Sequence, residues 1–390
     1  MGGGGRQFNG SPLQKAGATK PDSRFAVRAR GLKLVRPLGQ PSMRINQAPG
    51  LHRESGGKTA ALQARQTLLV RWRVLILPII AIFQAMCCGS ASAQTEKLTV
   101  PAAVQATLDK IYSGDISGAI EDSVRIEQGS PDHPIGYLLE AEATWWRIWC
   151  TTAEFKWGMS NTHHRAKLAA DRRYFDLAAK VASLAEAQIR EHETAEMQFY
   201  AGMGDALAAR LYGLRGEGRN TARTGVRARE HLLRALALDP DFADADFGLG
   251  LYNYYVDTLS TALRVLRFFM GIPGGTKEDG VRRLQHAIEQ GVLTPPEARF
   301  YLAINLHSYD HQYEHALQVI TPLVEKYPSN PIFQLARGDL FAKLGRKQQA
   351  IECYRAAAAA PMSDPECSKH IQELVRASLA AVGADAPVAK

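Results

Sequence analysis

Three histidines, His307, His311 and His315, follow one another at intervals of four residues, with Asp310 and Glu314 between them. On one continuous helix this spacing would place the three imidazoles on a single face, where they could bind zinc or a similar metal ion. Whether they can act together therefore depends on the helices that carry them.

A glycine-rich stretch, GIPGGTK at residues 271–277, has the composition of a phosphate-binding loop. It lacks the Gly-Lys-Ser/Thr ending, and no strand pattern precedes it. The HExxH, CxxC and GxSxG motifs of common hydrolases and redox proteins are also absent from the sequence. We therefore expect no enzymatic activity and no cofactor.

The positive charge of the chain is confined to its first quarter. Residues 1–93 carry 14 Lys and Arg side chains against Asp22 and Glu54, a net charge of +12, whereas the whole chain carries +8. The remainder has 33 basic and 37 acidic residues, a net charge of −4. A mildly acidic body predicts no nucleic-acid partner.

Residues 71–93 have the order of a secretory signal. Arg71 and Arg73 precede an uncharged apolar run at 74–86, and Ala91 and Ala93 flank a serine. The alternative is an uncleaved membrane anchor, because residues 74–93 carry no charge and reach the length of ~20 residues that spans a bilayer. Residues 1–70 predict a disordered basic leader, or a start codon placed too early. We expect an exported protein of the periplasm or cell envelope.

Removal of this leader would leave three cysteines, Cys150, Cys353 and Cys367. An odd number does not indicate a disulfide framework. Cys353 and Cys367 are also expected to lie too far apart for a bond, since Cys353 falls ~10 Å along its helix from the following turn. The sequence therefore predicts isolated buried thiols.

From residue 98 onward the pattern is helical, and it repeats. Ala316 and Leu323 correspond to Ala350 and Ala357, which lie 34 residues later. Pro328 corresponds in the same way to the neighbourhood of Pro361. A period of ~34 residues is typical of paired helices that stack along an array.

The clearest junction between two repeats is residues 228–255. Ala228 and Ala235 stand where helices cross closely, and Pro240 ends the second helix. Leu249 and Gly250 then occupy the next first helix. These positions resemble the tetratricopeptide repeat (TPR) superfamily, and together with the leader they suggest an exported bacterial TPR-containing protein.

The resemblance implies an all-α fold, a right-handed TPR-like superhelical solenoid of antiparallel helix pairs over residues 94–383. A capping helix is expected at 364–382 and a frayed end at 384–390. In this frame His307 ends one helix, His311 lies in the turn and His315 begins the next helix, so the spacing of four does not make one face. We therefore expect no metal site.

The resemblance also implies a partner-binding concave side, lined by first-helix residues. The residues at these positions are Trp145, Trp146, Phe247, Leu251, Tyr254, Tyr255, Tyr301, Asn305 and Tyr309. Their rings would supply large contact areas to an extended peptide or an apolar chain. The alternative is that they pack against neighbouring helices as core residues. Some TPR proteins anchor a carboxylate through Lys, Arg and Asn residues on this surface. In this chain only Asn305 and Lys343 resemble that pattern, so the resemblance does not favour a carboxylate clamp.

An insertion at residues 256–275 interrupts the array. Leu259, Leu263, Leu266 and Met270 have the spacing of one helix face, which Phe269 widens. We expect an inserted apolar helix, which either covers the core of the solenoid or contacts a membrane or apolar ligand.

The sequence thus favours a non-enzymatic exported TPR scaffold that binds a protein or peptide in an aromatic concave groove. The alternative is membrane-surface or lipid binding through residues 256–275.

Overall fold

The computed structural model describes residues 100–152, 167–260, 263–264, 267 and 270–384. These residues form helices and no strand. The helices are α2 (Ala102–Ser113), α3 (Ile116–Gly129), α4 (Ile135–Thr152), α5 (Ala169–Glu191), α6 (Ala195–Leu214), α7 (Gly218–Leu238), α8 (Ala245–Thr258), α10 (Lys277–Gln290), α11 (Pro295–Ser308), α12 (Tyr313–Lys326), α13 (Pro331–Lys343), α14 (Lys347–Ala359) and α15 (Pro365–Ala381).

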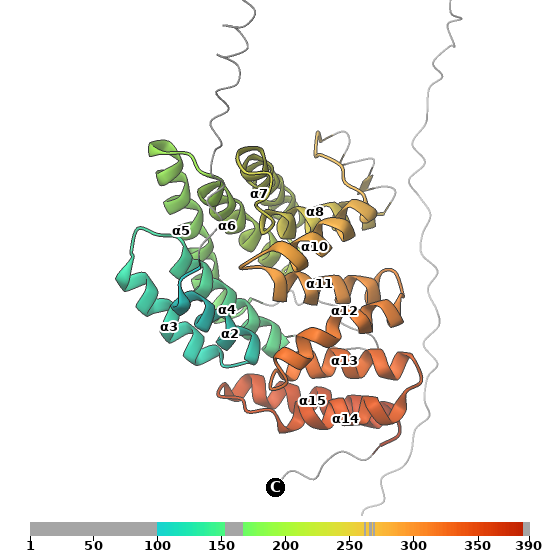
Figure 1. Cartoon of the computed structure of the whole chain (residues 1–390). Coiled ribbons are helices and arrows are strands. Elements are labelled where there is room, and N and C mark those ends of the chain that lie inside the picture. Colours follow the sequence, from blue (N-terminus) through green and yellow to red (C-terminus); the bar gives the residue numbers. More distant parts are fainter. Residues whose placement is uncertain (1–99, 153–166, 261–262, 265–266, 268–269, 385–390) are drawn as a thin grey trace, which may run out of the picture. The chain divides into compact units, whose positions relative to one another are not determined.

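Successive helices pair along the chain as α2 with α3, α4 with α5, α6 with α7, α8 with α10, α11 with α12, and α13 with α14 (Figure 1). This is a TPR-like superhelical solenoid of antiparallel helix pairs, and the predicted fold class is confirmed. The last helix, α15, begins after Asp364, whose carboxylate accepts from the Cys367 N–H at 3.0 Å. It caps the array as the sequence predicted.

Small residues set the distance between paired helices. A Cβ atom on Gly250 in α8 would lie 3.0 Å from the Gly280 carbonyl oxygen of α10, closer than side chains normally pack. Ala228 and Ala235 of α7 are likewise buried. Gly114 and Gly345 end α2 and α13 with φ of 93° and 72°, values that a side chain would strain.

The array closes on itself, because its first helix meets the turn between α12 and α13. The Tyr327 hydroxyl donates to Asp109 at 2.6 Å, and the Asn330 amide donates to the Tyr112 carbonyl at 2.9 Å. Ser329 makes a third bond of this kind to the Ser113 carbonyl, at 2.8 Å. These bonds join residues more than 200 positions apart, which an open solenoid would leave at opposite ends.

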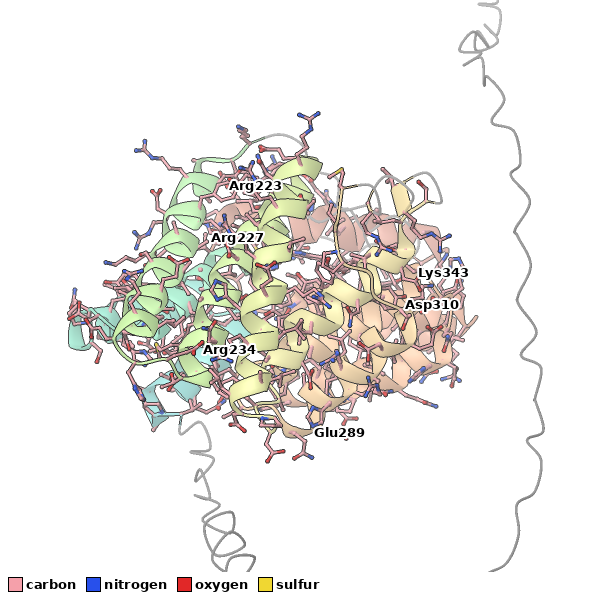
Figure 2. All side chains as sticks on the ribbon, turned by 90° about the horizontal axis from the view of Figure 1, so that it is seen from above. Arg223, Arg227, Arg234, Glu289, Asp310 and Lys343 are labelled. Carbon is pink, nitrogen blue, oxygen red and sulfur yellow. A yellow bond between two sulfur atoms is a disulfide. The ribbon has the colours of Figure 1, made fainter. Side chains whose placement is uncertain are left out.

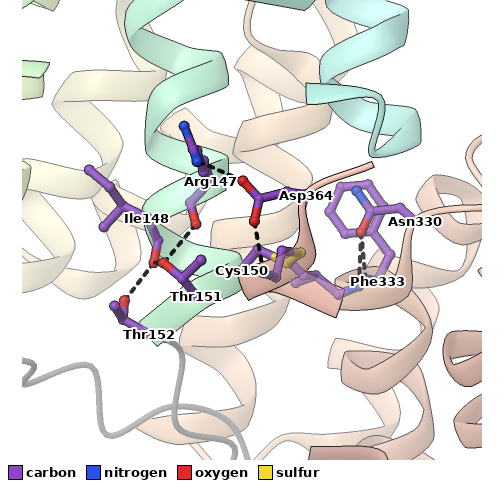
Figure 3. Close-up of a disulfide and its surroundings, with 10 residues drawn as sticks. Arg147, Ile148, Cys150, Thr151, Thr152, Asn330, Phe333 and Asp364 are labelled. Carbon is purple, nitrogen blue, oxygen red and sulfur yellow. Dashed lines mark hydrogen bonds and ion pairs between the residues drawn. A yellow bond between two sulfur atoms is a disulfide. The ribbon is translucent and has the colours of Figure 1, made fainter. Parts of the chain in front are cut away.

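A disulfide completes the closure. Cys150 at the end of α4 and Cys367 in α15 are bonded, with Cα atoms 5.1 Å apart and a sequence separation of 217 (Figure 3). Arg147 and Asp364 form an ion pair of 2.7 Å beside this bond. The prediction of isolated thiols was wrong for Cys150 and Cys367, because the return of α15 onto α4 depends on the curvature of the whole array. Cys353 is buried and free.

Aromatic rings fill the space inside the closure. Trp146 lies 4.9 Å from Phe300 and 5.4 Å from Phe333 between ring centroids, and Tyr112 approaches its edge at 6.0 Å. These four rings come from α2, α4, α11 and α13. The first and the last units of the array therefore share one hydrophobic core.

Several expectations lie outside the described residues or only partly within them. Residues 1–70 and 71–93 lie outside, as do residues 385–390 at the end of the predicted frayed segment. In the insertion, residues 263–264 and 267 are helical, whereas Leu266 and Phe269 lie outside the described residues. None of the described helices is long and apolar enough to cross a membrane.

Candidate functional site

A cavity of about 1730 Å³ lies within the array. Its walls come from α4, α6, α7, α8 and α11, with one residue each from α12 and α13, and residues of the insertion, among them Leu259 and Ile272, form a further side. First helices, second helices and the insertion therefore all contribute to one site.

Nine of the predicted contact residues line this cavity. They are Trp145, Phe247, Leu251, Tyr255, Tyr301 and Tyr309 from the predicted partner-binding set, and Leu259, Leu263 and Met270 from the insertion. The two predicted sets, one on the repeats and one on the insertion, thus meet in one place. Leu263, Met270 and Tyr309 are about half exposed, at 48%, 53% and 49%.

Trp146, Tyr254 and Asn305 do not line the cavity. Trp146 belongs to the aromatic core described above, because adjacent residues of a helix point in different directions and only Trp145 faces the cavity. Tyr254 donates to the Asn305 carbonyl at 3.1 Å and to Asp310 at 2.7 Å. Burial, followed by this hydrogen bond to Asp310, raises the pKa of Tyr254. These residues hold α8 against α11.

Tyr255 connects this packing to the cavity, since its hydroxyl donates to the Asn305 side chain at 3.1 Å while its ring lines the wall. Lys277, which starts α10, pairs with Asp310, and its backbone N–H donates to Asp257 at 3.0 Å. Both ends of the insertion are therefore fixed by polar contacts.

A buried ion cluster, which the sequence did not predict, supports the cavity wall. Arg210 of α6 donates to Glu142 and to the Tyr174 hydroxyl, both at 3.0 Å, and pairs with Glu297. Its guanidinium lies 4.2 Å from the centre of the Trp145 ring. The cluster orients Trp145, whose indole N–H in turn donates to Tyr301 at 3.1 Å.

One signal for this cluster was present in the sequence. Glu142 lies three residues before Trp145, so the two share a helix face. A charge on the same buried face as a tryptophan requires a partner. The sequence did not identify that partner, because Arg210 lies 68 residues away.

The surroundings of the ion cluster shift the pKa of one of its carboxyl groups. Burial, and then the neighbouring Glu142 carboxylate, raise the pKa of Glu297 from 4.5 to about 8, although Arg210 lowers it. A raised pKa favours the protonated form of Glu297, in which one guanidinium balances one carboxylate.

The raised pKa of Glu297 predicts that the stability of the fold depends on pH. Because the folded pKa is raised, the contribution of Glu297 is fully present below its unfolded pKa of 4.5 and is lost as the pH rises through about 8. Glu297→Gln is expected to flatten the decline in this window, by at most ~1.4 kcal/mol per pH unit. Urea unfolding of the unmodified protein and of Glu297→Gln, repeated at several pH values between 4.5 and about 8, measures how the free energy of unfolding changes with pH. An unchanged slope in the variant would contradict the assignment.

The cavity lining is also basic. Arg219, Arg223, Arg227 and Arg229 of α7 line it, as do Arg267 of the insertion and Lys343 of α13, whereas Glu142 and Glu230 are the carboxylates in the lining. Figure 2 shows Arg223 and Arg227 following one another along α7. The net charge of −4 for residues 94–390 concealed this local excess.

The histidines are placed as the repeat frame predicted. His307 lies in the last turn of α11, His311 in the turn with φ of 55°, and His315 in α12. Burial, and then Lys343, lower the pKa of His307 to about 4. Among the described residues, no group of three His, Cys, Asp or Glu side chains is placed to hold a metal ion.

No protein-family model matches the chain, and no curated protein matches it significantly. Among solved structures, it is similar to the human IFIT1 dimer with PPP-AAAA, with 17% identity and a TM-score of 0.34. It is also similar to a monomeric IFIT1 mutant with Gppp-AAAA, with 16% identity and a TM-score of 0.25. The matches cover 69% and 67% of this chain but only 61% and 49% of those chains. Similarity at this level does not assign a ligand.

Proposed function

We propose that the protein is a non-enzymatic scaffold that binds a segment of a protein or peptide in its central cavity. The observation that carries this proposal is the size and lining of the cavity. Its volume of about 1730 Å³ exceeds the ~300–1,000 Å³ of common small-molecule sites. The rings of Tyr255 and Tyr309 are partly exposed and offer contact area of the kind that dominates protein interfaces, whereas Trp145, Phe247 and Tyr301 are buried and form the base of the cavity.

We further propose that the protein is exported to a bacterial periplasm or cell envelope. The charged, apolar and small-residue order of residues 71–93 supports export, with residues 74–93 as an anchor if cleavage does not occur. The Cys150–Cys367 disulfide also supports it, because such bonds persist in oxidising compartments. N-terminal sequencing of the protein from its host tests cleavage after Ala93.

A photo-crosslinking residue placed in the cavity tests the scaffold function. Benzoylphenylalanine at Leu251, which lines the cavity, is expected to form crosslinks to discrete segments of a host protein, identified by mass spectrometry. Benzoylphenylalanine at Leu238, an exposed site at the end of α7 outside the cavity lining, is the matched control and should not form them. Crosslinks to lipid alone, or the same products from both sites, would contradict the proposal.

The exposed residues of the insertion favour a second function, contact with a membrane surface or an apolar ligand. Leu263 and Met270 are exposed at the edge of the cavity, and Arg264 is exposed beside them. Apolar side chains next to a cation are typical of segments that lie on anionic membranes. Flotation with phosphatidylglycerol vesicles that is lost in a Leu263→Ser, Met270→Ser variant would favour this second function.

A further inference from the structure

Two arginines in the cavity wall converge on one tyrosine. Arg229 of α7 lies with its guanidinium carbon 5.7 Å from the centre of the Tyr252 ring. Burial raises the pKa of the Tyr252 phenol, and the charges of Arg229 and of Arg267 in the insertion both lower it. The Tyr252 hydroxyl donates to the Pro273 carbonyl at 2.9 Å, which holds the return of the insertion against α8. All three side chains line the cavity.

Three guanidinium nitrogens of these two arginines are buried without acceptors. Nε of Arg229, and Nε and Nη1 of Arg267, have no hydrogen-bond partner among the residues that the structure describes. Other arginines of the wall are paired, Arg227 with Asp205 and Arg210 with Glu142 and Glu297. Buried guanidinium N–H groups without acceptors are costly, and two like charges near one ring add repulsion.

The local backbone leaves room for this arrangement. A Cβ atom on Gly274 would approach Nη2 of Arg267 to 3.3 Å, so a larger residue would crowd the guanidinium. The glycine at 274 therefore keeps the space beside the Arg267 guanidinium open.

We propose that Arg229 and Arg267 form an anion-binding anchor in the cavity wall, which takes a carboxylate of an acidic peptide segment that also carries apolar side chains. The inference rests on the proposed peptide-binding function. A carboxylate supplies the planar pair of acceptors that a guanidinium fork matches. The apolar side chains of the same peptide would then contact Leu251, Val256 and Ile272, which line the cavity as well.

The charges of the wall favour a peptide over nucleic acid. A nucleic acid carries a phosphate at every residue and needs cations along its whole path. Here Glu142 and Glu230 lie in the same wall, and Arg210 and Arg227 are already paired with carboxylates. A ligand with a few negative charges among apolar groups complements this surface better.

Two dyes that differ by one sulfonate test the anchor. The probes are 1-anilinonaphthalene-8-sulfonate and its neutral parent N-phenyl-1-naphthylamine, and each is added to the purified protein. Arg229→Gln and Arg267→Gln are each expected to weaken binding of the sulfonate dye about tenfold or more. The affinity for the neutral dye should be unchanged in both variants. Arg234→Gln, which removes an exposed arginine of the same helix that does not line the cavity, is the matched control for the loss of one positive charge. An equal loss in the control, or no loss in either variant, overturns the anchor.

Peptides then separate the anchor from the proposed function. In calorimetry, a short peptide of alternating Leu and Glu is expected to bind about tenfold or more tightly than its Leu/Gln counterpart, and only the former should depend on Arg229 and Arg267. Equal binding of the two peptides overturns the anchor and leaves the scaffold function standing. Failure of both peptides, with arginine-dependent binding of a single-stranded oligonucleotide or of phosphatidylglycerol vesicles, overturns the peptide as the ligand class.

Discussion

Replacing Cys150 and Cys367 with serine is expected to lower the free energy of unfolding by up to about 5 kcal/mol, because the bond closes a loop that spans 217 residues. A crosslink over so long a loop removes much of the entropy of the unfolded chain. Urea unfolding of the oxidised chain and the serine variant, at one pH and without reductant, measures the difference.

Cys353→Ser provides the control for losing a buried thiol without losing a bond, and its cost should be nearer ~1 kcal/mol. Peptide mapping under non-reducing conditions should also find the peptides of Cys150 and Cys367 joined. If the double variant were no less stable than Cys353→Ser, the bond would contribute nothing to the closure of the array.

Arg210→Met is the second change with a large expected effect, a loss of about 3–5 kcal/mol in the free energy of unfolding. Glu142 and Glu297 are both almost fully buried, and Arg210 is the cation that binds them. Without it, the remaining carboxylate charge has no compensation in a low-dielectric site. The same unfolding measurement, made near neutral pH, gives the result.

A compensating variant separates charge from packing. Adding Glu142→Gln and Glu297→Gln to Arg210→Met removes the uncompensated charge and should recover most of the lost stability. If the triple variant stayed as unstable as Arg210→Met alone, the arginine would act through its contact with Trp145 rather than through charge.

The local architecture could be predicted from the sequence because each repeat is a local unit. Ala228, Ala235, Pro240 and Gly250 determine a helix end and two close crossings through contacts with neighbouring helices only. The same frame correctly separated the three histidines. Patterns of this kind record short-range packing, which is why they were sufficient for the fold class and for the terminal helix α15.

The closure could not be predicted in this way. Whether Tyr327 reaches Asp109, or Cys367 reaches Cys150, depends on small rotations accumulated over all the units between them. Both adjacent tryptophans are buried, and the same geometry decides that only Trp145 also lines the cavity. The sequence did not predict that Arg229 and Arg267 share one wall, because net charge does not show which charged side chains line the same cavity.

The meeting of α2 with the turn before α13 has a further consequence for modularity. An open solenoid can gain or lose a hairpin and keep its remaining interfaces, and it can fray from either end. In this chain an added hairpin would carry Asn330 away from Tyr112 and Cys367 away from Cys150, so the number of units is fixed by the requirement that the two ends meet. We therefore expect the array to unfold as a single cooperative unit, because neither end can fray independently of the other.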